Sequence, residues 1–113
     1  MNELELVQEL FKDRIGVVIL LIQTSHKIDI KAFQEADVQA RLLARLFKEY
    51  ALIPKAMLNE LHVAAKILRA EAPYCKSDAN TLVKMAEQLE MTFDLILRGE
   101  CHDDRVPGVP RII

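Results

Sequence analysis

The side chains of this chain best suited to catalysis are two cysteines and three histidines. A thiolate at Cys75 is a nucleophile when an imidazole such as that of His26 stabilises its charge. The only support for such a pair is that both residues are predicted to lie at the same end of the fold, and residues of these types are common in loops. We therefore interpret the group as a helix cap, a turn tyrosine and a free thiol. Its members are His26, Asp29, Tyr74, Cys75 and Asp78.

A second group of chemically capable side chains is the run Cys101-His102-Asp103-Asp104, with His62 part-way along a preceding segment. Thiolate, imidazole and carboxylate are all metal ligands, but adjacent residues rarely surround one tetrahedral ion. The sequence has no CxxC, HxxxH or HExxH spacing, and it lacks the ExxH pattern of di-iron bundles. We interpret His62 as a boundary residue. The sequence thus predicts no metal, no cofactor and no catalysis by the protein itself, and a small Cys/His-dependent or metal-dependent enzyme stays an alternative.

Basic residues form a stripe on the second predicted helix, comprising Arg41, Arg45 and Lys48, with Lys55 beyond it. Phosphate contacts require several such charges on one surface. Asp37 can pair with Arg41 at i,i+4, and the stripe is further diluted by Glu49. We therefore interpret the stripe as a solvated helix face, and we keep a nucleic-acid regulator as the alternative function.

Composition predicts one globular domain. The chain has 113 residues, 51% of them hydrophobic and 5% aromatic, and its net charge is −2. A charge this small creates no field that attracts nucleic acid. The longest apolar run, Ile15 to Ile22, is too short for a bilayer that needs about 20 residues. Acidic residues precede the run, where a signal peptide would be positively charged. We expect a cytoplasmic protein that does not enter the membrane.

Apolar residues recur at helical spacing in four segments, which cap and breaker residues separate. The segments are about 3–24, 30–52, 54–71 and 77–98. Short connections between them favour an all-α, four-helix, up-down-up-down bundle. We divide the chain into a helical domain, 1–99, and an extended, non-helical tail, 100–113, which contains two prolines and a glycine. Cys75 and Cys101 then flank a helix about 30 Å long, so no disulfide can join them.

Residues 15–22 also permit a different interpretation. Five of these eight residues are β-branched, which suits a buried strand. However, no other segment offers a convincing partner strand, and a single strand leaves its backbone groups unpaired. We therefore favour a helix that is apolar on all sides over residues 15–22. Such a helix is usually enclosed, either at a bundle centre or in a subunit interface.

These patterns predict a small protein-interaction or regulatory module that forms a homo-oligomer, most simply a homodimer. One four-helix core cannot easily cover all the apolar side chains, and exposed apolar patches tend to mark interfaces. The prolines of the tail reduce the entropy that it loses on docking. The tail then packs on its own bundle, on another subunit or on an unidentified protein partner. The predicted interaction residues are Val17, Leu20, Val63, Ile67, Val106, Val109, Ile112 and Ile113.

Overall fold

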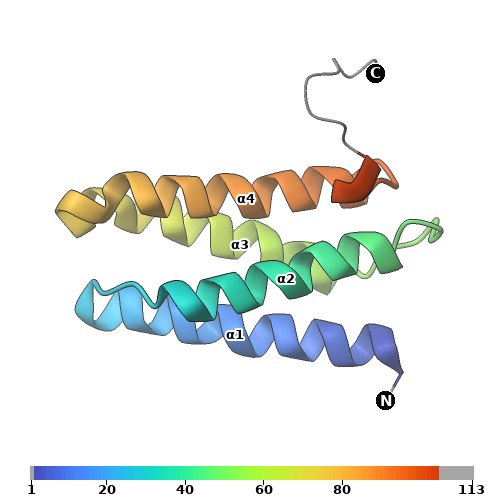
Figure 1. The fold of residues 1–113 in the computed structure, drawn as a ribbon, viewed down its shortest axis with the longest axis horizontal. Helices are drawn as coiled ribbons and strands as arrows, with labels where there is room; N and C mark the ends of the chain where they lie inside the picture. The colour runs from blue at the N-terminus through green and yellow to red at the C-terminus, as the bar shows by residue number, and fades with distance from the viewer. Residues whose placement is uncertain (1, 105–113) are drawn as a thin grey trace.

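The protein is all-helical over the residues that its computed structural model describes, 2–104 (Figure 1). The predicted all-α class is confirmed for these residues, and the strand interpretation of residues 15–22 is wrong because they lie inside the first helix. The α-helices are α1 (Glu3–Ser25), α2 (Ile30–Leu46), α3 (Lys55–Glu71) and α4 (Ala79–Leu97), and the short 3-10 segments are η1 (Ala72–Asp78) and η2 (His102–Asp104). None of these helices has both the length and the apolar character that crossing a bilayer requires.

Helix α1 begins at a side-chain cap and buries one of its apolar stripes. Asn2 accepts a hydrogen bond from the backbone N–H of Glu5 at 2.8 Å, which satisfies one of the free amides of the first turn. His26 ends the helix in the left-handed conformation, with φ of 55°, and donates its N–H to the carbonyl of Ile22. The buried stripe consists of Val7, Phe11, Ile15, Val18 and Ile22.

Helix α2 starts as the sequence predicts but ends six residues early. Asp29 is the N-cap, and its Oδ1 accepts a hydrogen bond from the N–H of Ala32 at 2.9 Å. The predicted end at Leu52 is wrong, because the helix stops at Leu46. Beyond it the bonds tighten to the i→i+3 type, as between Tyr50 N–H and the Phe47 carbonyl. Tyr50 therefore lies beyond the end of the helix and is 53% exposed.

Helices α3 and α4 are linked by η1 with no intervening loop. The turn between them occurs at Lys76, where φ is 45° and ψ is −108°. Asp78 precedes α4 and is of a residue type that often caps helices, but it makes no side-chain cap hydrogen bond. Its backbone (φ −96°, ψ 4°) is not the extended conformation that directs an N-cap side chain towards the first free amides.

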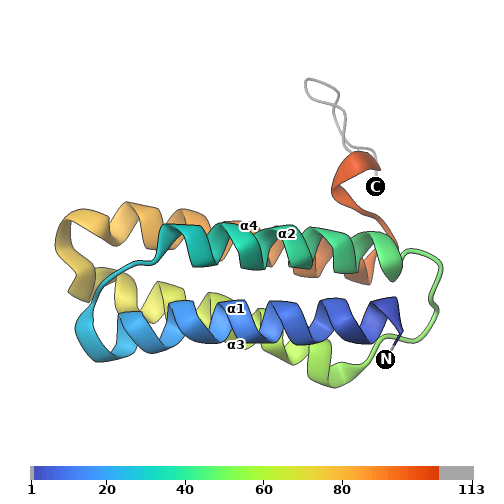
Figure 2. The same ribbon diagram turned by 60° about the horizontal axis from the view of Figure 1, so that its bottom comes forward.

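The helices pack as two pairs, α1 with α2 and α3 with α4. In Figures 1 and 2 the members of each pair run in opposite directions, and α1 runs in the same direction as α3. The pairs also contact each other, α2 against α4 and α1 against α3. The core between them is mainly aliphatic and includes Val18, Ile22, Leu43, Leu61, Leu68, Leu82 and Leu89, all fully buried.

Two aspartates at helix starts provide a matched test of capping. We expect Asp29→Ala to lower the free energy of unfolding by about 1 kcal/mol, because the N-cap hydrogen bond is lost. Asp78→Ala should lower it by much less, since its carboxylate makes no cap bond. Urea unfolding followed by circular dichroism measures both. Equal losses in the two variants would contradict the assignment of the cap.

Candidate interaction surface

A row of exposed apolar side chains runs along α1 and is here named the α1 apolar face: Leu6, Leu10, Val17 and Leu20. Residues 15–22 contribute Val17 and Leu20, because this stretch is apolar on every side whereas only one stripe of the helix packs into the core. Leu6 and Leu10 extend the face towards the start of the helix. Leu6, Leu10 and Val17 lie about a third of a turn away from the buried stripe. Leu20 is 64% exposed, which is high for a leucine within a helix. The expected enclosure of this stretch within one chain is therefore only partial.

One neighbour of the α1 apolar face is Val38 on α2, which is also exposed. Leu10 and Val38 line a shared shallow hollow with Arg14, Glu35 and Gln39. An ion pair at its edge joins Arg14 Nε to Glu35 Oε2 at 3.9 Å. Both side chains of the pair are largely solvated, so the pair adds little stability but places charge beside the apolar row.

On the other side of α1, the predicted residues Val63 and Ile67 lie on α3. Val63 is exposed, whereas Ile67 is half-buried. His26 Nε2 and Glu71 Oε1 are 3.9 Å apart, which places the ends of α1 and α3 side by side. Because both helices run in the same direction with the same rise, Val63 lies near the level of Val17. Val17 is two and a half helical turns from His26, so it projects from the side of α1 opposite to the one that meets α3. The predicted residues of the helical domain therefore share a level along the helices but not one surface. The remaining four, Val106, Val109, Ile112 and Ile113, lie outside the described residues.

At the end of the molecule that holds His26 and Cys75, the residues have roles in the fold rather than in a catalytic site. Asp29 caps α2, and His26 ends α1. Tyr74 is an exposed residue of η1. The Cys75 thiol is buried, and burial is the main cause that raises its pKa, with the negative charges of Glu71 and Asp78 adding to it. A raised pKa favours the neutral thiol, which is the opposite of the activated thiolate that a nucleophile requires.

Cys75 should therefore react slowly in the folded protein. We expect iodoacetamide at neutral pH to alkylate Cys75 far more slowly in buffer than in denaturant, because burial disfavours the thiolate and restricts access. Intact-mass spectrometry and peptide mapping over time measure the rate. Alkylation of native Cys75 faster than that of the unfolded chain would contradict this account and favour an activated thiol.

At the other end, η2 packs against the last turns of α2 through two ion pairs, here named the C-terminal clamp. Asp103 Oδ2 lies 2.9 Å from Arg45 Nη2, and Asp104 Oδ1 lies 2.7 Å from Lys48 Nζ. The backbone N–H of Cys101 donates to the second oxygen of Asp104 at 2.9 Å, and the Cys101 side chain is buried. The expectation of an extended tail from residue 100 is therefore wrong over His102–Asp104, where the clamp folds the chain into a 3-10 turn.

The clamp pairs residues of the predicted basic stripe with carboxylates of the predicted metal-ligand group. Arg45 and Lys48 are paired with the clamp carboxylates, and Arg41 Nε is paired with Asp37 Oδ2 at 2.9 Å, as the sequence predicted. Fewer free cations remain on α2 for phosphate contacts. Within residues 2–104 no three His, Cys, Asp or Glu side chains are grouped so that they could hold a metal ion. Both described cysteines are free, which confirms the prediction that no disulfide joins them.

The contribution of the clamp should depend on pH. The hydrogen bond from Lys48 is the main cause that lowers the pKa of Asp104, followed by the bond from the Cys101 N–H. A carboxyl whose pKa is lower in the folded state adds stability above its unfolded pKa of about 4, and this stability is lost as pH falls through the folded pKa. We expect Asp104→Asn to lower the urea midpoint at about pH 7 but not at about pH 2.

Asp103→Asn is the control for this measurement, because the Asp103–Arg45 pair is more exposed to solvent than the Asp104–Lys48 pair. Its effect at neutral pH should be smaller. A difference between wild type and Asp104→Asn that persists unchanged at the acidic pH would contradict the role given to the ionised carboxylate.

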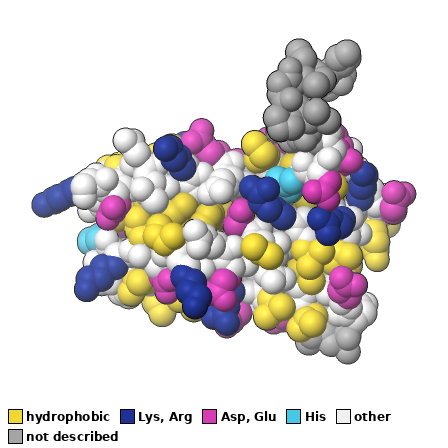
Figure 3. All heavy atoms as spheres, viewed as in Figure 1, with side chains coloured by type: hydrophobic (Ala, Val, Ile, Leu, Met, Phe, Trp, Pro, Cys, Tyr) yellow, Lys and Arg dark blue, Asp and Glu magenta, His cyan; other side chains and the backbone are white. Residues whose placement is uncertain are grey.

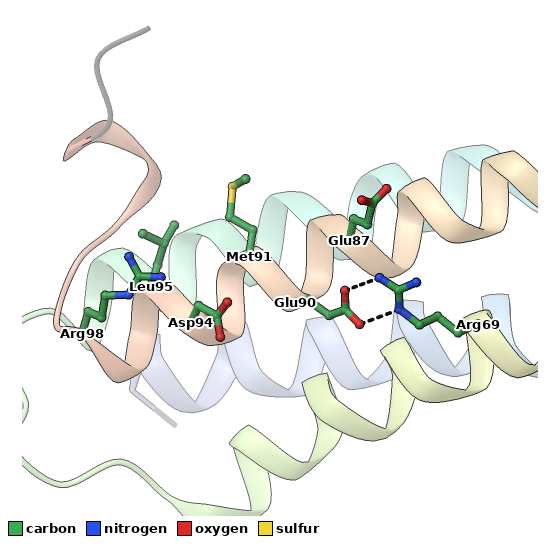
Figure 4. A pocket seen from close by; sticks show the side chains of 7 residues that line it. All are labelled: Arg69, Glu87, Glu90, Met91, Asp94, Leu95 and Arg98. Carbon is green, nitrogen blue, oxygen red and sulfur yellow. Dashed lines mark hydrogen bonds and ion pairs between the residues drawn. The ribbon is translucent and has the colours of Figure 1, made fainter. Parts of the chain in front are cut away.

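A polar groove lies on α4 beside α3 (Figure 4). Arg69 of α3 binds Glu90 of α4 in a bidentate ion pair, with N–O distances of 2.7 and 2.6 Å. This hydrogen bonding is the main cause that lowers the pKa of Glu90. The rest of the lining alternates in charge and polarity, and comprises Glu87, Met91, Asp94, Leu95 and Arg98. We interpret the groove as a polar edge of the α3–α4 contact, in which the Arg69–Glu90 pair joins the two helices.

No family model, curated protein or solved structure matched this chain significantly in comparisons of sequence and fold.

Proposed function

We propose that this protein is a small interaction or regulatory module that self-associates as a homodimer through the α1 apolar face. It has no catalytic activity of its own in this proposal. The observation that carries it is the exposure of four apolar side chains on one side of α1, with Val38 and Val63 exposed on the neighbouring helices. Water-exposed apolar rows of this kind favour association because their burial releases about 25 cal/mol per Å².

The spacing of the α1 apolar face suits contact with a second copy of itself. An antiparallel pairing of two α1 helices about a two-fold axis near Asp13 would place Leu10 against the partner subunit's Val17. The same axis would place Leu6 against the partner subunit's Leu20. The same axis brings the two Asp13 side chains near each other, and Arg14, whose Nη1 lies 3.9 Å from Asp13 Oδ2 within each copy, places a positive charge beside each carboxylate. Gly16, with no atom within 4 Å of where a Cβ would lie, leaves room for close approach near this centre.

The size of the face sets the expected strength of the dimer. Leu6 and Leu20 are about 21 Å apart along the helix axis. A contact area of this length and about 20 Å wide, which is two helix widths, covers on the order of 400 Å² on each copy. Stable interfaces bury about 800 Å² per partner, so this one belongs to the weak class. We therefore propose a dimer that forms with rising concentration, in the micromolar range or above.

The framework for this surface is, in our proposal, a four-helix up-down-up-down bundle in which the turn at Lys76 separates α3 from α4. We also propose a cytoplasmic location, a compartment in which both cysteines would stay reduced. The unidentified partner of a regulatory module would use the same apolar surface or residues of the tail. The paired state of the α2 cations favours this proposal over a nucleic-acid regulator.

Two leucine substitutions test the interface. Leu20→Lys should abolish the concentration-dependent dimer, because each copy loses about 2 kcal/mol of apolar burial and would have to bury an unpaired charge. Leu97→Lys is the matched control: Leu97 is 58% exposed against 64% for Leu20, but it lies on α4. Both changes put a cation near a helix C-terminus, where it does not weaken the helix.

Size-exclusion chromatography with light scattering measures the outcome across micromolar concentrations. Wild type and Leu97→Lys should rise from the monomer mass of 12.9 kDa towards twice that value, while Leu20→Lys should stay at the monomer mass. A strictly monomeric wild type over the whole range, or a dimer that Leu20→Lys leaves intact, would refute dimerisation through this face.

A further inference from the structure

The polar groove on α4 lies close to the point at which the described chain ends. Thr92 Oγ1 and His102 Nε2 are hydrogen-bonded at 3.1 Å, so η2 lies against the second half of α4. Met91 and Leu95, on either side of Thr92 in the sequence, line the groove. Figure 4 shows both of them on the same side of α4 as η2. The chain that follows Asp104 therefore begins beside the groove.

The groove presents an accessible apolar side chain between two accessible carboxylates. Met91 is 40% exposed. Glu87 and Asp94 lie about one helical turn before and after it, and both are exposed. In Figure 4 the side chains of Glu87 and Met91 project from the same side of the helix. Figure 3 likewise shows charged side chains of both signs and apolar ones along the upper edge of the molecule, over α4.

The charges of the groove favour a basic occupant. Its lining contains three carboxylates and two guanidinium groups, an excess of one negative charge. Arg69 holds Glu90 in the bidentate pair. Within residues 2–104, neither Glu87 nor Asp94 makes an ion pair shorter than 4.0 Å. A cation that enters the groove thus finds two carboxylates that direct ion pairs do not occupy.

The residues that follow Asp104 have the complementary composition. Residues 105–113 include two arginines, Arg105 and Arg111, and no acidic residue; apart from one glycine, the others are valine, isoleucine and proline. Nine residues span about 28 Å in the extended conformation that proline favours, whereas the groove is about 17 Å long along α4. Because these residues are attached beside the groove, they reach it at an effective concentration on the order of millimolar.

The spacing of the two sets of side chains defines a register. Two residues of an extended segment span about 6.2 Å, and the helix rises about 6 Å between Glu87 and Met91. A segment antiparallel to α4 therefore brings Val109 to Met91 and Arg111 to Glu87 at the same time. We propose that residues 105–113 occupy the polar groove of their own chain in this register, with Arg111 paired with Glu87 and Val109 packed on Met91.

Arg111→Glu in the full chain tests the pairing. The reversal replaces an attraction by a repulsion, so the docked population should fall by about fivefold or more. NMR of carbon-13 methyl-labelled methionine measures the loss, because Val109 no longer packs on Met91. We expect the Met91 methyl resonance to shift, whereas those of Met57 and Met85, which are buried in the core, stay in place.

Two further variants identify the cause of the shift. Lys27→Glu makes the same change of charge at an exposed residue between α1 and α2, and it should leave the Met91 resonance unchanged. Glu87→Arg should release the segment by itself. Addition of Arg111→Glu to Glu87→Arg restores opposite charges, so it should move the Met91 resonance in the opposite direction to Arg111→Glu alone.

Three results would overturn the proposal: a Met91 resonance that Arg111→Glu leaves in place, a charge swap that does not reverse the shift, or a shift that disappears on dilution. The last would assign the segment to the groove of a second copy. Arg111→Glu leaves residues 2–104 unchanged, so it remains decisive if Glu87→Arg fails to fold. The same comparison in the Leu20→Lys background separates this result from that of the proposed dimer.

Discussion

Burial of aliphatic side chains between the α1–α2 and α3–α4 pairs is the interaction on which the rest of the described structure depends. Aromatic residues are few, so the core gains its stability from many leucine, isoleucine, valine and alanine contacts. A helix offers only part of its circumference to such a core. The surplus apolar residues of α1 therefore remain at the surface, and the candidate interaction surface is a direct consequence of how the core is formed.

Polar contacts then hold together parts of the helices that lie outside the core. Arg69 and Glu90 cross-link α3 to α4, and the C-terminal clamp ties the end of the described chain to α2. These ion pairs are largely solvated, and each contributes modestly to stability. Their main effect is to hold neighbouring elements together and to pair charged side chains that would otherwise be free to contact another molecule.

Local signals allowed much of the fold to be predicted from the sequence. The stripe from Val7 to Val18 and the cap at Asp29 depend on residues three or four positions apart, and such spacings can be read directly. The end of α2 at Leu46 was missed, because apolar spacing continues to Tyr50 after the backbone has left the helix. Asp78 was misjudged because residue type indicates a cap, whereas backbone conformation decides whether one forms.

The candidate sites were predicted less completely. The exposure of Val17, Leu20 and Val63 agrees with the surplus of apolar residues in the sequence, although their role in association stays a prediction. The clamp was missed because its partners are 58 and 56 residues apart, a separation without any periodic signal.

Pairing of Arg45 and Lys48 with the carboxylates of the clamp has a kinetic consequence. With a net charge of only −2 and with these two cations paired, the molecule projects only a weak long-range potential. Diffusional encounters between copies, or with another protein, would then receive little electrostatic steering. Association rates should lie near the 10⁵–10⁷ M⁻¹s⁻¹ typical of unsteered docking, roughly independent of ionic strength.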